Sequence, residues 1–422
     1  MKGKTRQVTQ TPHWVSAKVK QCFKFRNGKG FSGVLKSIPD EEYCYPVYGG
    51  NGIMGYSDKY LLEEPTIIVG RVGEYCGNVF KTQEKSWVTD NAMMVYDVLL
   101  EDYDVDFWTA MLNSLSFNHY SDSTGQPKIT QGGIGAISFK YPSEKTEQTA
   151  IANILSTVDE AIASVQNSIA AVERLKKSLM QNLLTGKMKP DGTFRTPDEF
   201  YIDEKFGKVP TGWEVKRVDA LFDFYPTASY SRSMLSDNGD CKYIHYGDIH
   251  TRFHTFLDIS KESLPYINKD MVKKFVYLEN GDIIISDTSE DYEGVGKLVE
   301  IVNLGDSKVI SGLHTLLLRP KTDELINGFK GYLFNEERVR LEFLKYVTGI
   351  KVYSISKNSL AKVLLPIPTR HEQEAIKSKI DVINNNISSS KTKINSLERL
   401  KKSLMQNLLT GKIKIEIFND YD

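Results

Sequence analysis

The stretch ERLKKSLMQNLLTGK occurs twice in this chain without a single change, at residues 173–187 and again at residues 398–412. Upstream of each copy the match weakens but keeps its register, with the dipeptide EQ at 147–148 and at 372–373. Still further upstream the similarity nearly disappears. The chain is therefore predicted to contain two copies of one unit, each with a variable head followed by a constant helical stalk.

Both stalks carry the pattern of a coiled coil. Apolar residues recur at alternating steps of four and three, which places them on one seam of a helix. The seam positions are Ile151, Leu155, Val158, Ile162, Val165, Ile169 and Val172 in the first stalk, and Ile376, Ile380, Ile383, Ile387, Ser390, Ile394 and Leu397 in the second. Each stripe then widens, at Leu175, Leu179 and Leu183 and at Leu400, Leu404 and Leu408. A TG dipeptide followed by lysine predicts where each helix ends.

The two stalks are expected to pack against each other. A helix from Glu147 to Thr185 is about 58 Å long at ~1.5 Å per residue, and its exposed seam needs a partner. Equivalent units that meet through the same surface do so about a two-fold axis, which makes the pair antiparallel and places the heads at opposite ends of a rod. A coiled coil with a purely structural role is the alternative.

The predicted fold class is α+β. Two mixed α/β globular heads are separated by two long helices that form an antiparallel coiled coil with a pseudo-two-fold repeat. The predicted boundaries are a first head at 1–142, a helical region at 143–189, a linker at 190–209, a second head at 210–366, a second helical region at 367–414 and a tail at 415–422. Prolines stand just before both helices, where a helix interior excludes them.

Composition limits the class of protein. The chain has 422 residues, 26% of them charged, and a formal net charge of zero, so attraction to nucleic acid must come from local patches. The sequence shows neither a membrane span nor a signal-peptide core, which favours a cytoplasmic protein with no membrane partner. Four scattered cysteines, Cys22, Cys44, Cys76 and Cys241, predict free thiols and neither a disulfide framework nor a zinc ribbon.

Three patterns suggest ligand chemistry but lack its context. The glycines of YGGNGIMG at 48–55 match a dinucleotide motif, yet no apolar helix follows them, so a turn between short strands explains them better. The segment EGVGKL at 293–298 has misplaced glycines and a leucine where a phosphate loop needs Ser or Thr. Three histidines, His245, His250 and His254, predict solvent-facing or base-contacting side chains more than metal ligands.

A nuclease hypothesis was tested in the same way. Pro197 and Asp198, followed by Glu214, Val215 and Lys216, match the loose pattern of a metal-dependent DNA nuclease. So short a pattern arises often by chance, and the segment between its two parts resembles the start of a new domain. The chain also lacks the Asn/Asp-Pro-Pro-aromatic segment that holds an extruded adenine for methylation. We predict a chain with no catalytic residues and no bound cofactor or metal.

Polar loops between short strands are the candidate DNA-binding surface. Arginine and asparagine can make bidentate contacts to guanine or adenine, and exposed aromatic rings can stack or contact methyl groups. The candidates in the first head are Tyr48, Asn51, Tyr56, Arg71, Tyr75 and Asn78. The candidates in the second head are Tyr230, Arg232, His245, Tyr246, Thr288, Ser289 and Lys297.

These features together resemble the specificity subunit of a type I restriction-modification system. The resemblance extends over essentially the whole chain. It rests on both stalks, the EQ pairs and the LLTGK endings, together with PTGWEV at 210–215, YIHYGDI at 243–249, PVYGGNGIMGYSDKYL at 46–61 and EEPTIIVGRVG at 63–73. It implies two target-recognition domains, each reading one half of a split, asymmetric site in double-stranded DNA.

The resemblance also implies partners. The stalks would space the heads and bind two methyltransferase subunits, with motor-nuclease subunits joining the complex, and these partners would bring S-adenosylmethionine, ATP and Mg²⁺. Because packing explains the repeated leucines but not the repeated polar residues, the latter are the candidate docking positions. They are Arg174, Lys176, Lys177, Gln181, Arg399, Lys401, Lys402 and Gln406. The alternatives are a coiled-coil adaptor whose heads bind proteins or glycans, and a self-contained nuclease.

Overall fold

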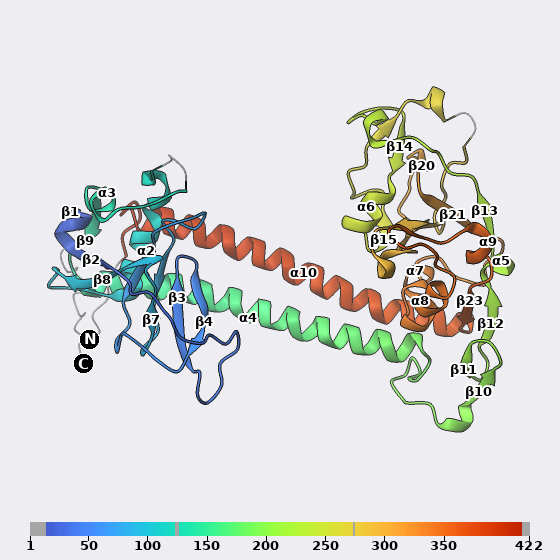
Figure 1. The fold of residues 1–422 in the computed structure, drawn as a ribbon, viewed down its shortest axis with the longest axis horizontal. Helices are drawn as coiled ribbons and strands as arrows, with labels where there is room; N and C mark the ends of the chain where they lie inside the picture. Colours follow the sequence, from blue (N-terminus) through green and yellow to red (C-terminus); the bar gives the residue numbers. More distant parts are fainter. Residues whose placement is uncertain (1–13, 123–125, 273–274, 416–422) are drawn as a thin grey trace, which may run out of the picture. The chain divides into compact units, whose positions relative to one another are not determined.

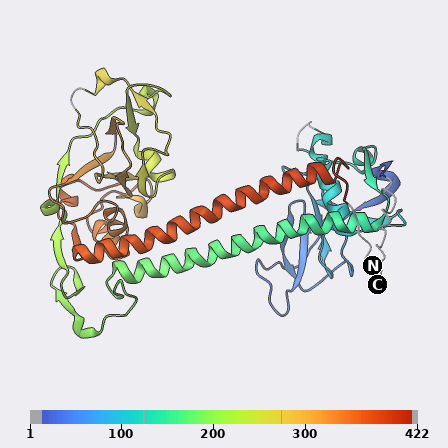
Figure 2. The same ribbon diagram turned by 180° about the vertical axis from the view of Figure 1, so that it is seen from behind.

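A computed structural model describes residues 14–122, 126–272 and 275–415 of the chain (Figures 1 and 2). The chain divides into two compact units, one formed by residues 1–168 with 390–422 and the other by residues 169–389. The two long helices are α4 (Lys145–Leu184) and α10 (Arg370–Leu408), and both cross this division. Each unit therefore contains one head together with a part of each long helix.

The first unit holds two small sheets and one strand pair. The four-stranded sheet has the order β2 (Phe23–Asn27), β8 (Ala92–Val98), β5 (Ile67–Gly70) and β6 (Val79–Lys81). The three-stranded sheet has the order β4 (Gly52–Ser57), β3 (Tyr45–Gly49) and β7 (Trp87–Val88). Strand β1 (Trp14–Lys18) pairs with β9 (Ser138–Pro142). Short helices are α1 (Val19–Cys22), α2 (Val105–Ser114), η1 (Phe117–Tyr120) and α3 (Gln131–Gly135).

The second unit has a larger mixed sheet. Its order is β13 (Phe222–Tyr225), β21 (Thr315–Pro320), β17 (Ile283–Ser286), β19 (Leu298–Val302) and β15 (Thr255–Asp258). A three-stranded sheet has the order β16 (Tyr266–Ile267), β14 (Cys241–Ile244) and β20 (Val309–Ser311). Strand β12 (Glu214–Arg217) pairs with β23 (Leu364–Ile367), β10 (Phe200–Asp203) with β11 (Gly207–Pro210), and β18 (Thr288–Ser289) with β22 (Tyr353–Ser354).

Short helices complete the second unit. They are η2 (Pro197–Glu199), α5 (Val218–Leu221), η3 (Arg232–Met234), α6 (Tyr246–Thr251), η4 (Lys269–Met271), η5 (Tyr292–Gly294), α7 (Lys330–Phe334), α8 (Glu337–Leu344) and α9 (Lys357–Leu360). The central strands β5 and β17 read IIVG and IIIS and are buried throughout, as apolar runs inside a sheet are expected to be.

The long helices run antiparallel within each unit. In the first unit, Ile151 and Leu155 near the start of α4 share a core with Leu408 near the end of α10. In the second unit, Leu183 near the end of α4 shares a core with Ile376 near the start of α10. The beginning of each helix thus packs against the end of the other, which confirms the predicted pairing.

The predicted widening of the apolar stripe is wrong at two positions. Leu175 is 53% exposed and its counterpart Leu400 is 48% exposed. The four-three alternation explains this result, because after Val172 and Leu397 the next seam positions are 176 and 401, one residue beyond these leucines. Lysines therefore lie on the seam, and Lys401 forms an ion pair with Asp159 of α4, at 2.6 Å.

Both long helices end as predicted, with a glycine in the left-handed region. Gly186 has φ of +69° and Gly411 has φ of +67°, a conformation that favours glycine. The described part of the chain holds no helix that is both long enough and apolar enough to cross a bilayer. All four cysteines are free, and burial raises the pKa of the Cys22 and Cys241 thiols to about 11, so both stay protonated at neutral pH.

Candidate nucleic-acid interface

In the second head, three loops meet where strands end. Strands β14 and β20 are parallel neighbours, so the loop after β14 and the turn between β20 and β21 lie at the same edge. The loop after β17 joins them, because the Asp287 amide donates to the His314 carbonyl, at 3.1 Å. The side chain of His250, on α6, also contacts the Ser286 hydroxyl, at 2.8 Å. We call these three loops the second-head loop cluster.

Aromatic and imidazole rings cover this cluster. The ring of Tyr246 lies 4.7 Å from that of His245, 5.3 Å from that of His314 and 6.1 Å from that of His250, measured between centroids. His245 and Tyr246 are half-buried, whereas His314 is exposed. Burial, followed by the charge of Arg232, lowers the pKa of His245 below its usual value, so this ring is neutral at pH 7. A partly exposed aromatic ring such as that of Tyr246 can stack on a base.

Two carboxylates, Asp248 and Asp287, lie within the loop cluster. Asp248 is 3% exposed, and one of its oxygens accepts a hydrogen bond from Arg232 at 2.8 Å, while the other has no hydrogen-bond partner among the described residues. Asp287 lies 3.5 Å from the His314 Nδ1, too far for a firm hydrogen bond. Burial raises the pKa of Asp287. The cluster therefore combines ring faces with donors and acceptors that the fold leaves incompletely paired.

The structure brings some of the predicted second-head residues together and separates others. His245 and Tyr246 belong to the loop cluster, and Arg232 of η3 contacts it through Asp248. The Thr288 carbonyl contacts His250, at 2.9 Å. Tyr230 packs against Phe275, and its hydroxyl donates to the Met271 carbonyl, so it supports the fold. Ser289 accepts a hydrogen bond from the Asp291 amide within its own turn, and Lys297 is exposed after η5.

Sequence reasoning missed three members of the cluster. Asp248, Asp287 and His314 were not among the candidates, although Asp287 directly follows the buried strand IIIS. A polar residue just beyond the end of such a strand was a usable signal, because strand ends present their loops at one edge of a sheet. His314 lies in a tight turn with φ of +55°, and no sequence pattern predicts a histidine in that conformation.

In the first head, two glycine turns approach closely. A Cβ on Gly70 would lie 2.3 Å from the carbonyl oxygen of Gly50, so the backbones need glycine here. This approach brings Asn51 next to Asn78, whose amide donates to it at 3.4 Å. Within the described residues, the Arg71 guanidinium reaches only the Asp90 carbonyl, at 3.5 Å. These three side chains form the counterpart of the second-head loop cluster.

The tyrosines of the first head differ from one another. The prediction for Tyr48 is wrong, because it is 4% exposed and its hydroxyl accepts a hydrogen bond from the Gln83 amide. Its position in β3 points it into the core below the hairpin. Tyr56 is half-buried on β4, beyond the turn itself, and Tyr75 is 47% exposed beside Asn78 in the β5–β6 loop.

The EQ pairs anchor both helix starts. The side chain of Gln148 donates to the Pro142 carbonyl, at 3.0 Å, and accepts from the Asp104 amide, at 3.2 Å. Gln373 donates to the carbonyls of Pro368 and Glu324 and accepts from the Ile326 amide, at 2.8 to 3.0 Å. Each glutamine therefore ties the first turn of a long helix to the head that precedes it.

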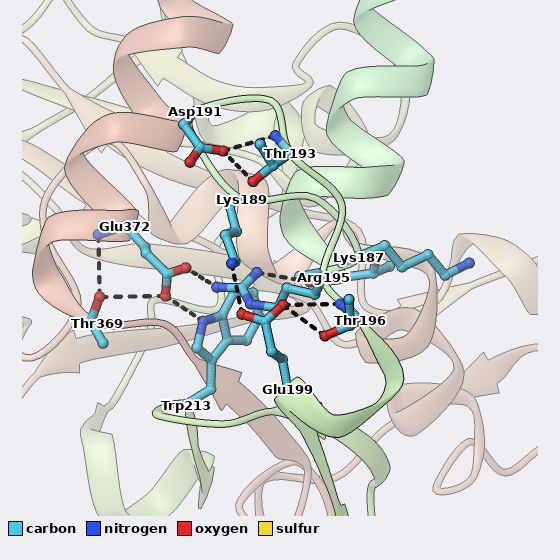
Figure 3. A network of polar contacts seen from close by, with 12 residues as sticks. Lys187, Lys189, Asp191, Thr193, Arg195, Thr196, Glu199, Trp213, Thr369 and Glu372 are labelled. Carbon is cyan, nitrogen blue, oxygen red and sulfur yellow. Dashed lines mark hydrogen bonds and ion pairs between the residues drawn. The ribbon is translucent and has the colours of Figure 1, made fainter.

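The glutamates of the EQ pairs accept from tryptophans. The Trp14 indole donates to Glu147, at 3.2 Å, and the Trp213 indole donates to Glu372, at 2.5 Å. Figure 3 shows that Arg195 also reaches Glu372, forming an ion pair that is almost fully buried. Glycines at the helix ends lie against these tryptophans, Gly411 against Trp14 and Gly186 against Trp213. We call these two sites the first and second junctions.

The repeated block presents matched exposed faces. Arg174, Lys177 and Gln181 are exposed, as are their counterparts Arg399, Lys402 and Gln406. Lys401, also a predicted docking position, does not belong to this exposed face, because it lies on the seam and forms an ion pair with Asp159. Lys176 occupies the matching seam position and is half-buried. The exposed leucines Leu175 and Leu400 border the two faces.

The metal-dependent alternatives find no support in the described ranges. No group of three or more His, Cys, Asp or Glu side chains there is placed to hold a metal ion. Lys216 contacts Glu214 and Glu324, so it does not orient a water molecule beside Asp198. His245 accepts from the Gly247 amide. Gly50 lies in the predicted turn between β3 and β4, whereas Gly52 and Gly55 lie in β4 itself.

Known proteins share this architecture. Residues 12–174 and 210–399 match the model of the type I restriction-modification DNA specificity domain. A type I restriction enzyme MjaVIII specificity subunit from Methanocaldococcus jannaschii is 23% identical over 84% of this chain and 77% of its own length. A type I restriction enzyme EcoprrI specificity subunit from Escherichia coli is 32% identical over 38% of this chain and 39% of its own length.

Solved structures agree on the fold. The crystal structure of a type I restriction-modification system S subunit from M. genitalium superposes with a TM-score of 0.56 and 16% identity, covering 95% of this chain and 97% of that one. Two matching segments in the family model correspond to the two heads with their helices. The chain therefore belongs to the family of type I restriction-modification DNA specificity proteins, as a specificity subunit with two target-recognition domains.

Proposed function

We propose that this chain recognises a split, asymmetric site in double-stranded DNA, with each head reading one half. The supporting observation is the contrast between loops and helices. The loops of the two heads differ in chemistry: the first head combines Arg71 with two asparagine amides, and the second combines Arg232 with the rings around Tyr246. The repeated helix faces, by comparison, are identical. Identical helix faces for docking partner subunits, combined with different loops for reading DNA, fit a subunit that gives sequence specificity to a shared enzyme.

Two methyltransferase subunits dock on the repeated block, one on each copy. Each copy exposes a cationic and amide face formed by Arg174, Lys177 and Gln181 or by their counterparts, and each exposes a leucine at its edge. An exposed leucine beside polar groups offers the mixture of apolar and polar contacts that protein interfaces use. Leu175 and Leu400 are therefore the apolar anchors of two equivalent docking sites.

Catalysis belongs to the partners. Adenine methylation with S-adenosylmethionine, and ATP- and Mg²⁺-dependent cleavage, take place on methyltransferase and motor-nuclease subunits, and this chain supplies recognition. The complex works in the cytoplasm, where the chromosomal DNA lies. With a net charge of zero, the isolated chain binds DNA weakly, and lysines and arginines of the partners supply most of the phosphate contacts.

Methylome sequencing tests the reading of two half-sites. A host carrying the complete system should show a two-part methylated motif. Exchanging the segment that contains one head for that of a related protein should change one half of the motif and leave the other half unchanged. A continuous motif, or a change in both halves after a single exchange, would contradict the proposal.

Docking is tested with the methyltransferase subunit and two matched variants. Leu175→Asp and Leu400→Asp should each remove one of two bound methyltransferase subunits, which native mass spectrometry measures directly. Ser164→Asp, at an exposed position of α4 outside the repeated block, is the control. Full binding of two subunits by the double leucine variant would disprove this docking face.

A further inference from the structure

Arg232 differs from the other arginines of the second head. It lies in η3 with its side chain 58% exposed, and it makes a hydrogen bond to Asp248 through one terminal nitrogen. Among the described residues, its remaining N–H groups have no hydrogen-bond partner. A guanidinium carries five donors, so most of those of Arg232 are available to a ligand.

The other arginines of this head use their donors within the fold. Arg319 bonds Asp282 and the Tyr277 carbonyl. Several contacts to backbone carbonyls and carboxylates also hold Arg252, Arg338 and Arg340. Arg217, at the end of β12, is exposed but pairs with Asp219 of α5. Strand β12 pairs with β23, the strand before α10, so Arg217 lies outside the loop cluster. Arg232 is thus the arginine that combines free donors with a place beside the rings.

Asp248 fixes where those donors point. Its carboxylate is buried, so it cannot swing outward, and it holds one end of the guanidinium at 2.8 Å. A charged group held by a rigid partner loses less conformational freedom when it binds a target. The arrangement therefore presents a preorganised row of donors at the edge of the loop cluster.

The surrounding charge favours a base edge over a phosphate. Arg252 lies 3.8 Å from the same Asp248 and 3.5 Å from Glu262, so two guanidinium groups and two carboxylates balance. Phosphate attraction depends on excess positive charge, which this group does not have. Guanine presents two neutral acceptors, O6 and N7, in the major groove, and these match the fork of an arginine.

We propose that Arg232 reads a guanine in the half-site of the second head, and that Asp248 is its positioning residue. This inference rests on the proposed function of the heads. Replacing a bidentate arginine contact removes about 10- to 100-fold of the preference for guanine over other bases at one position. Removing the Asp248 charge loosens the same guanidinium and affects the same position to a smaller degree.

The test uses the reconstituted complex with its methyltransferase subunits and a DNA library in which the second half-site is randomised. Wild type should require guanine at one position, and Arg232→Lys should relax that position by about 10- to 100-fold while leaving all others intact. Asp248→Asn should relax the same position less. Arg217→Lys, an exposed carboxylate-paired arginine outside the cluster, is the matched control.

The outcomes separate the possibilities. If Arg232→Lys weakens methylation of all sequences equally, the side chain contacts a phosphate and the proposal is overturned. It is also overturned if the second half-site has no required guanine. Retained selection of the first half-site shows that each variant is folded and assembled. If the wild-type complex shows no sequence dependence in the second half-site at all, the proposed function of this head fails instead.

Discussion

The two junctions perform the same task with different charge balance. In the first, Glu147 is buried, accepts from Trp14, and has a carboxylate oxygen with no hydrogen-bond partner in the described part of the chain. In the second, Glu372 accepts from Trp213 and also pairs with Arg195. Arg195 comes from the segment that follows the first long helix. Two copies of one motif therefore have unequal electrostatic support.

The difference shows which part of the motif is structural. Both glutamines, both tryptophans and both terminal glycines occupy matching places, so the junction geometry is set by hydrogen bonds and close packing. Arg195 belongs to the second junction, and no described residue forms an equivalent ion pair with Glu147 in the first. Desolvation of Glu147 raises its pKa, which is the physical consequence of lacking that partner.

The largest expected effect is the removal of Arg195. Arg195→Leu leaves the Glu372 carboxylate buried beside Trp213 without its cation and should lower the free energy of unfolding of the second unit by about 3 kcal/mol. Urea unfolding followed by tryptophan fluorescence measures this change. The control is Lys189→Ala, which removes a partly exposed pair with Glu199 and should cost less than about 1 kcal/mol. Equal effects of the two variants would contradict the role of Arg195.

The glutamines provide the next comparison. Gln373 makes three hydrogen bonds and Gln148 makes two, all to backbone groups. Replacement by leucine leaves those buried groups unpaired, so Gln373→Leu should cost about 3 kcal/mol and Gln148→Leu about 2 kcal/mol. The same unfolding measurement distinguishes them. A larger loss of stability for Gln148→Leu than for Gln373→Leu would contradict the expectation that the glutamine with more hydrogen bonds contributes more.

The terminal glycines should differ in the same direction. A Cβ on Gly186 would lie 2.2 Å from the Pro210 ring, whereas one on Gly411 would lie 3.0 Å from the Trp14 ring. Both backbones are left-handed, which alone costs alanine about 1 kcal/mol. Gly186→Ala should therefore lower the free energy of unfolding by about 2 kcal/mol and Gly411→Ala by about 1 kcal/mol. Gly192→Ala, left-handed but with open space around it, isolates the backbone contribution.

The smallest effect has the opposite sign. Glu147→Gln keeps an acceptor for the Trp14 indole but removes a buried charge, so it should stabilise the first unit by about 1 kcal/mol at pH 7. Because the pKa of Glu147 is raised on folding, its wild-type contribution is fully present below the unfolded pKa and is lost as pH rises through the folded pKa. The advantage of the variant should consequently grow from about pH 4.5 upward and vanish in acid.

The same substitution in the other copy gives the contrast. Glu372→Gln weakens the ion pair with Arg195 and should destabilise the second unit at pH 7. Thermal unfolding of both variants across pH 4 to 8 compares them directly. Stabilisation by both substitutions would mean that the arginine does not compensate for burial of the carboxylate.

Much of the fold was predictable because it is periodic. A seam repeated at steps of four and three, glycines after both LLT segments and prolines before both helices are local signals, and they placed α4 and α10 closely. The seam also held the information that positions 176 and 401 face the other helix. The prediction at Leu175 and Leu400 was wrong because it relied on residue type, whereas the four-three spacing continues through positions 176 and 401.

The candidate interface was predictable only in part. Arg232, His245 and Tyr246 were found from residue type and loop context, but Tyr48 has the same residue type and lies in the core. An alternating strand assigns side chains to two faces, and only packing decides which face is inside. Asp248 was missed because a single carboxylate after a short strand has no distinguishing pattern, whereas Asp287 follows the buried strand β17 and that position was a usable signal.

The sequence by itself determined the duplication, the two helices and the family, because these depend on repetition and spacing along the chain. Only the tertiary structure decided which buried carboxylates of the two repeats are paired and which are not. Glu372 pairs with Arg195, and Asp248 accepts a hydrogen bond from Arg232, although no sequence pattern links these residues. The oxygen of Glu147 that has no partner among the described residues could not be foreseen from the sequence either. Such contacts depend on burial and on side-chain direction, and those are properties of the packed chain.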